Sequence, residues 1–316
     1  MSYVTHTITL KSDRHFGKRV PSDAIGRILF GLPSAVRHSI RMAFERRSTG
    51  GHSPAWLDAA SDIRFVDHEG EDETILYFES PLLGEAAENL YREQQLEFWS
   101  KLPAPDDTGF DLLGDVLSDV AQENADSERF DSPLLRKIAA FRKGLNGTFK
   151  GMRLSGHRYT DQCPAILDLT VIQTAERFCS ITPTPERARI VGTLDMIRAS
   201  TNSFALKLND DQEVRGVLVE GEIEKVKDLF KKEVLVLGQA VYRPSRKLLR
   251  IDADQVSLAE QESSIWSHVP EPKGTRLDVS ALRKPQGPRS GVAAIIGKWP
   301  GDETDAEIQR ELETVS

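Results

Sequence analysis

The run Asp67-His68-Glu69 contains residue types with which proteins bind metal ions and transfer protons. Two carboxylates beside an imidazole can ligate zinc or serve as general acid and base. The run lies between two stretches rich in β-branched and aromatic residues, 63–66 and 74–78, and Gly70 follows it. This context is typical of the polar tip of a β-hairpin. We therefore expect a solvated turn here and no metal site.

The other residues that could do chemistry are scattered. His15, His52 and His157 stand apart from any serine or cysteine nucleophile motif, and the sequence has no Gly-x-Ser-x-Gly, phosphate-loop or Gly-x-Gly-x-x-Gly pattern. The paired acids Asp106-Asp107 and Asp302-Glu303 occur in turn-like contexts, where carboxylates commonly cap helices. We therefore expect no catalytic residues, no metal and no cofactor, and a protein that is not an enzyme.

Composition points to a folded chain of more than one domain. Its 316 residues are 39% hydrophobic and 28% charged, which is enough apolar material for real cores. The net charge of -8 means that any nucleic-acid contact must come from a local basic patch. Cys163 and Cys179 lack zinc-ligand spacing and are expected to be free thiols. No segment has the length and apolarity of a membrane span or secretion signal, so we expect a cytoplasmic protein without a membrane partner.

The first block, residues 1–150, has the pattern of a mixed α/β domain. Residues 3–10 alternate with period two and predict a strand, and 63–66 with 74–78 predict the hairpin. Apolar residues at helical spacing predict helices over 25–32 and 34–44, separated at Pro33-Ser34. Further helices are expected over 82–98, 110–120 and from Pro133 onward. The chain as a whole is therefore expected to belong to the α+β class.

The second block, residues 151–260, is dominated by expected strands. These cover 166–174, 190–197, 204–208, 214–218, 234–242 and 248–256, with a helix over 222–230. From Ile190 onward the order is three strands, a helix and two strands, which fits a small five-stranded barrel of the OB type. A small open sheet would give a similar pattern.

This expected barrel carries a second candidate function. OB barrels often bind single-stranded nucleic acid through a basic groove and aromatic platforms. Aromatic residues are scarce here, and acids such as Asp195 and Asp252 oppose anion binding, so a structural barrel or protein-docking module is the alternative. The candidate nucleic-acid-binding residues are Arg198, Lys207, Arg215, Tyr242, Arg243, Arg246, Lys247 and Arg250.

The third block consists of a Pro- and Gly-rich linker, residues 261–289, and a helical tail, residues 290–316. The tail contains two short apolar stripes at helical spacing, joined by the turn Trp299-Pro300-Gly301. Helices this short are marginal in water, so they need a surface to bury their stripes. That surface is either a groove on a partner or the protein's own core. The candidate partner-binding residues are Val292, Ile295, Ile296, Lys298, Trp299, Asp302, Glu303, Ile308 and Leu312.

Residues 297–305, Gly-Lys-Trp-Pro-Gly-Asp-Glu-Thr-Asp, followed by an acidic segment, resemble the C-terminal tail of bacterial antitoxins encoded beside PIN-domain ribonuclease toxins. The resemblance covers about 25 residues. It implies that the tail wraps a toxin and blocks an acidic, Mg-dependent active site. The chain departs from those antitoxins, which are usually small and begin with a DNA-binding module, because about 260 other residues precede the tail.

The sequence thus favours an antitoxin-like protein that binds and neutralises a partner toxin through residues 290–316. The alternative is a nucleic-acid-binding protein that uses the barrel, and an enzyme is the third possibility.

Overall fold

Five strands from the N-terminal part of the chain form one antiparallel sheet. The computed structural model describes the chain apart from residues 52, 95–101, 146, 220–225, 261–264 and 274–316. The strands lie in the order β2-β3-β1-β4-β5, and His6, Ile8 and Leu10 of the central strand face the core. The expected hairpin is confirmed as β2 paired with β3, but Asp67, His68 and Glu69 are exposed residues of β2 that pair with β3, so the turn expected at these positions is wrong and lies after Glu69. Their bounds are β1 Tyr3–Lys11, β2 Arg64–Glu69, β3 Thr74–Pro81, β4 Gly151–Ser155 and β5 Ala165–Asp168.

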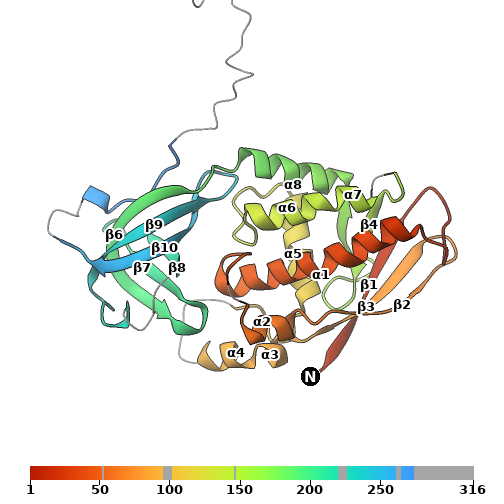
Figure 1. Ribbon diagram of the computed structural model, residues 1–316, viewed down its shortest axis with the longest axis horizontal. Helices are drawn as coiled ribbons and strands as arrows, with labels where there is room; N and C mark the ends of the chain where they lie inside the picture. The colour runs from red at the N-terminus through yellow and green to blue at the C-terminus, as the bar shows by residue number, and fades with distance from the viewer. Residues whose placement is uncertain (52, 95–101, 146, 220–225, 261–264, 274–316) are drawn as a thin grey trace, which may run out of the picture. The chain divides into compact units, whose positions relative to one another are not determined.

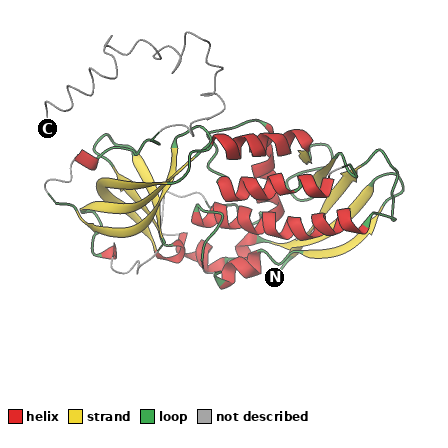
Figure 2. Cartoon of the chain, turned by 45° about the horizontal axis from the view of Figure 1, so that its top comes forward, coloured by secondary structure: helices red, strands yellow, loops and turns green. Residues whose placement is uncertain are grey.

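Helices pack against this sheet and share its hydrophobic core (Figures 1 and 2). Three of them begin at a side chain that accepts a hydrogen bond from the first turn: Thr108 for α5, Asp131 for α6 and Asp168 for α8. The helices are α1 Ser22–Glu45, α2 Ala55–Ala60, α3 Leu83–Ala86, α4 Glu88–Gln94, α5 Gly109–Ala121, α6 Ser132–Ala140, α7 Arg142–Leu145 and α8 Leu169–Ile181.

The predicted break at Pro33 is wrong, because α1 is a single helix that contains this proline. An internal proline costs a helix roughly 3 kcal/mol. The compensation lies in one continuous buried stripe at intervals of four residues, which extends on both sides of Pro33. Burial of each such side chain contributes roughly 1.5–3 kcal/mol, so the stripe outweighs the proline. Its members are Ile28, Leu32, Val36 and Ile40.

Two further expected elements differ in the structure. The strand expected over 166–174 is short, because Asp168 ends β5 and caps α8. The helix expected over 82–98 is divided at Ala87 into α3 and α4, and its last residues lie outside the described part of the chain.

A closed five-stranded barrel follows, which confirms the expected barrel. The strands lie in the order β10-β8-β7-β6-β9, and β9 also pairs with β10 to close the ring. β8 and β10 are parallel and the other pairs are antiparallel, as in OB barrels. The barrel has its own core, separate from that of the helices and sheet. Its elements are β6 Glu186–Arg198, the 3-10 turn η1 Ala199–Thr201, β7 Ser203–Lys207, β8 Glu213–Leu218, β9 Glu233–Tyr242 and β10 Leu248–Leu258.

The domain boundary predicted at residue 150 requires correction. β4 pairs with β1, β5 pairs with β4, and residues of α8 belong to the N-terminal core. The barrel therefore begins at Glu186, not at residue 151. The compact unit extends to Lys273, so it includes residues 265–273 of the expected linker. Val269 packs on the barrel core, and the backbone amide of Lys273 donates to Glu186.

Cys163 and Cys179 are free thiols, as expected. Among the described residues, the helices all fall short of the length and apolarity needed to cross a membrane.

Candidate functional site

The residues expected to bind a partner protein all belong to the segment 292–312, which lies outside the described residues. They are Val292, Ile295, Ile296, Lys298, Trp299, Asp302, Glu303, Ile308 and Leu312. Their roles remain predictions from the sequence. The residues expected to bind nucleic acid lie on the described barrel, and the structure gives each of them a position.

Arginines from the barrel converge on Glu128, which lies between α5 and α6. Arg243, directly after β9, donates to Glu128 Oε1 at 2.7 Å, and Arg215 of β8 lies 3.0 Å from Oε2. Arg46, directly after α1, lies 3.5 Å from the same Oε2. One carboxylate therefore accepts from three guanidinium groups. Arg215 has a further partner in Glu213, at 2.9 Å.

Asp126 and Asp131 extend this contact between the acidic segment and the barrel. Lys247, in the β9–β10 turn, pairs with Asp126 at 2.6 Å. Arg250 of β10 donates to Asp131 at 3.2 Å and pairs with Asp252 at 2.7 Å. Arg250 and Asp131 are both buried. The barrel is thus held to the segment 126–131 by charge-assisted hydrogen bonds, which are stronger than neutral ones.

Other members of the predicted nucleic-acid set are unsuited to the role. Tyr242 is buried in the barrel core, so its ring offers no platform for a base, and burial raises its pKa. Arg198 is buried at the end of β6. Lys207 is exposed and pairs with Asp211 at 2.8 Å.

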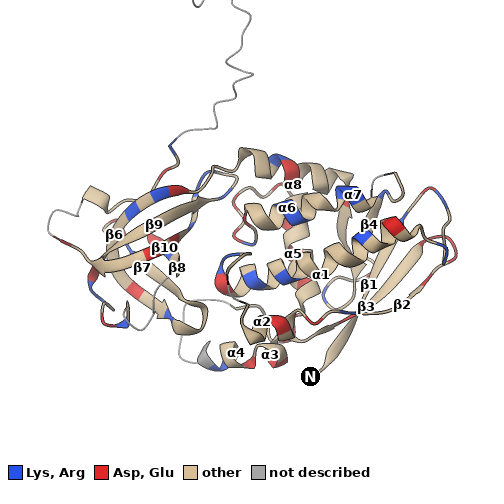
Figure 3. Cartoon of the chain, viewed as in Figure 1, with Lys and Arg blue, Asp and Glu red and all other residues tan. Residues whose placement is uncertain are grey.

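Arg246 differs from the rest of the set. It occupies the left-handed position of the β9–β10 turn, with a φ of 73°, and its side chain is exposed. Its side chain makes no ion pair with the described residues. It lines a groove of about 1010 Å³ together with Arg215, Arg243 and Lys247. The structure therefore brings four of the eight predicted residues into one groove, although three of them are already paired with acids. In the part of the chain that the structure describes, basic and acidic residues are interspersed (Figure 3).

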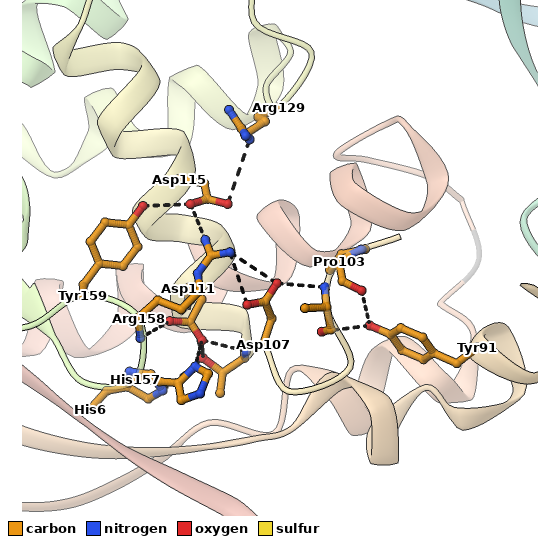
Figure 4. Close-up of polar contacts among 12 residues, drawn as sticks. His6, Tyr91, Pro103, Asp107, Asp111, Asp115, Arg129, His157, Arg158 and Tyr159 are labelled. Carbon is orange, nitrogen blue, oxygen red and sulfur yellow. Dashed lines mark hydrogen bonds and ion pairs between the residues drawn. The ribbon is translucent and has the colours of Figure 1, made fainter. Parts of the chain in front are cut away.

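A second polar cluster surrounds the start of α5 (Figure 4). Thr108 and Asp111 form a capping box, and His6 of β1 lies 3.0 Å from the Thr108 hydroxyl. His157 Nδ1 lies 3.2 Å from Asp111, whose other oxygen accepts from the backbone amide of Arg158 at 3.0 Å. The network therefore connects β1, the start of α5 and the loop after β4.

The guanidinium of Arg158 joins further acids to this cluster. It pairs with Asp107 at 3.2 Å and with Asp115, which also accepts from the Tyr159 hydroxyl at 2.8 Å. Asp107 Oδ1 has no hydrogen bond among the described residues, because Arg158 approaches it as an ion pair outside hydrogen-bonding geometry.

Possible ligand atoms of Asp107, Asp111 and His157 lie within 4.8 Å of one another, which would suit a cation. Arg158 already neutralises Asp107, and both oxygens of Asp111 accept hydrogen bonds. A metal would have to displace these partners and overcome the repulsion of the guanidinium. The arrangement is best explained as a structural network that closes around the start of α5.

Burial controls the protonation of this network. It lowers the pKa of His6 to about 4, an effect that Asp111 only partly offsets. Burial also acts to raise the pKa of Asp111, but the hydrogen bonds from Thr108 and Arg158 outweigh it and lower this pKa. His6 is therefore neutral and Asp111 charged at neutral pH.

Stability should fall as the pH falls from about 6.5 to about 4. In this window the unfolded chain takes up a proton at His6 that the folded chain refuses, and a shift of this size corresponds to as much as roughly 3 kcal/mol. Urea unfolding at pH 7 and pH 4.5 measures the loss, and His6→Gln should reduce it. An unchanged loss in His6→Gln would contradict the account. His15→Gln, at an exposed histidine, is the control.

Sequence reasoning missed the His6 network because its members come from positions 6, 108, 111 and 157. The one local signal was Thr108-Gly109-Phe110-Asp111, which has the spacing of a capping box. A comparison with models of known protein families, with curated proteins and with solved structures finds no match to this chain.

Proposed function

We propose that the chain is an antitoxin-like protein that binds a partner toxin, a PIN-domain Mg-dependent ribonuclease, through residues 290–316. The observation that carries the proposal is the segment 297–305 with an apolar stripe on each side. Val292, Ile295 and Trp299 share one helical face, and Ile308 and Leu312 share another. Stripes of this width suit a groove on a partner, and tryptophan is a frequent anchor in such contacts.

The described part of the chain supports the proposal indirectly. Arg215, Arg243, Lys247 and Arg250, the residues that favoured the nucleic-acid alternative, pair with acids of the same chain. Tyr242 is unavailable for stacking. The structure of the barrel therefore supports the nucleic-acid-binding alternative less than the sequence of the barrel did. Tail binding remains the function for which the chain carries a specific motif.

The chemistry of neutralisation follows from the charges of the tail. Lys298, or a basic residue of the preceding linker such as Arg289, would reach the partner's acidic metal site and compete with Mg²⁺ for its carboxylates. The apolar stripes would hold the segment in place and occlude substrate. A ribonuclease toxin of this kind acts in the cytoplasm, so this chain must also be in the cytoplasm to bind it.

Deletion of residues 290–316 should abolish neutralisation. The test is to co-express the full chain or the truncated chain with the product of the adjacent gene and to measure growth. We expect growth with the full chain and arrest with the truncated one, while circular dichroism shows that the truncated chain is folded. Full protection by the truncated chain would refute the proposal, as would a neighbouring product that is harmless on its own.

A further inference from the structure

Two separate hydrophobic cores divide the described chain, and little apolar packing joins them. The helices and the antiparallel sheet, here called the helical body (residues 1–181), share one core, and the barrel has its own. In the part of the chain that the structure describes, Leu249 is the one barrel side chain that packs on the core of the helical body. Parts of a chain that lack a large apolar interface are expected to move relative to one another. The contact between barrel and body therefore depends mainly on polar groups.

Most of these polar groups are ion pairs that solvent can reach. We call them the ionic contact, and they join Asp126 and Glu128 of the body to Arg215, Arg243 and Lys247 of the barrel. Glu128 is 40% exposed, and Asp126 and Lys247 are 47% and 68% exposed. Glu128 also lines two open spaces, a groove of about 1010 Å³ and a cavity of about 380 Å³. Exposed ion pairs contribute little to stability, and salt weakens them further.

One short segment of backbone connects the helical body to the barrel. α8 ends at Ile181 and β6 begins at Glu186, and the four residues between them are Thr-Pro-Thr-Pro. The two prolines have no backbone N–H to donate, and the last two residues of the segment are exposed. After the barrel, residues 265–273 pack on it and do not return to the body. The segment 182–185 is therefore the one covalent connection between body and barrel, and it can serve as a hinge.

The hinge and the ionic contact lie at the same end of the barrel. Glu186, at the start of β6, pairs with Ala240 near the end of β9, and Arg243 directly follows β9. The opposite end of β9 begins at Glu233, roughly 30 Å from Arg243 at the usual rise of a strand. A rotation of about 20° at the hinge would therefore move that end of the barrel by roughly 10 Å.

The buried pair between Arg250 and Asp131 can separate without leaving a charge buried and unpaired. Arg250 keeps Asp252, a carboxylate of the barrel at 2.7 Å. Asp131 keeps the backbone amides of Ser48 and Leu134, which belong to the helical body. Breaking a buried pair is costly when one charge stays in the interior without a partner. Rotation of the barrel would instead bring both groups into water.

We propose that the barrel and the helical body are two rigid parts hinged at residues 182–185, that the ionic contact holds them closed, and that salt opens the hinge. The length over which charges attract falls from about 8 Å at physiological salt to about 3 Å at 1 M salt. Each part keeps its own core in the open state, so opening does not require unfolding. The hinge is independent of the tail and of its proposed partner.

Double electron–electron resonance on the full chain measures the opening. One spin label is attached to Cys163, an exposed thiol of the body, and the other to Lys232→Cys, an exposed position beside Glu233, in a Cys179→Ser background. We expect one narrow distribution of distances at low salt. At about 1 M salt the distribution should shift or broaden by roughly 10 Å, while the circular dichroism spectrum stays unchanged.

Removal of the acids should open the hinge at low salt. Glu128→Gln combined with Asp126→Asn leaves the basic residues of the barrel without a charged partner on the body, so the distribution should broaden as it does at high salt. The matched control is Glu176→Gln combined with Asp13→Asn, which changes net charge equally at two exposed pairs within the body. The control should keep the narrow distribution.

Three results would overturn the proposal. The first is a distribution that stays narrow and unshifted at about 1 M salt. The second is equal broadening in the control variant, because net charge and not the ionic contact would then be responsible. The third is a broad distribution at low salt in the chain that retains Asp126 and Glu128, because the ionic contact would then fail to hold the two parts closed.

Discussion

Asp131→Ala is expected to lower the free energy of unfolding by about 3–5 kcal/mol, the range for breaking one side of a buried ion pair. Asp131 is buried and accepts hydrogen bonds from the backbone amides of Ser48 and Leu134 as well as from Arg250. Its loss removes the cap of α6 and leaves Arg250, itself buried, with Asp252 as its remaining carboxylate. Chemical denaturation followed by circular dichroism measures the change.

Two variants define what that result would mean. Asp131→Asn preserves the size of the side chain and an acceptor for the α6 cap but removes the charge, so its loss should be smaller. Asp13→Ala breaks a pair between exposed Asp13 and Lys150 and should change stability little. A loss for Asp131→Ala no greater than that for Asp13→Ala would contradict the role assigned to the buried pair.

Trp299→Ala is expected to weaken binding of the partner toxin by about 30-fold or more. A tryptophan anchor at the centre of an interface contributes at least about 2 kcal/mol, which corresponds to that factor in the dissociation constant. Trp299 closes the first apolar stripe and begins the turn Trp-Pro-Gly, so no neighbouring side chain replaces it. Titration calorimetry against the product of the adjacent gene measures the change. Thr314→Ala, near the end of the tail and outside both stripes, is the control and should leave affinity unchanged.

The strands of the barrel were predicted well because the pattern that identifies each strand is confined to neighbouring residues. The large buried side chains of Phe204 and Leu206 alternate with the smaller or polar residues Ser203, Ala205 and Lys207, and short connections join β7 to β8 and β9 to β10. The boundary at residue 150 failed for the opposite reason. β4 pairs with β1 across more than 140 residues, so Met152 and Leu154 complete a sheet that began at Tyr3. A pattern confined to neighbouring residues cannot report such a pairing.

The roles of charged residues were harder to predict than their positions. A basic residue on a strand has the same sequence signature whether it meets a ligand or an acid of its own chain. Arg250 was expected at a nucleic-acid surface, but the buried carboxylate of Asp131 takes its guanidinium. Asp126, Glu128 and Asp131 lie more than 80 residues before the basic residues of the barrel that they contact. Only the fold reveals which of these cations remain available.

The central claim is that residues 290–316 carry the affinity for the partner, and one titration tests it most directly. The product of the adjacent gene is titrated with the full chain and with residues 1–273, the compact unit that ends before the tail. The account predicts tight binding by the full chain and no measurable binding by residues 1–273. Equal affinity of the two chains would contradict it, because the contact would then belong to the body of the protein.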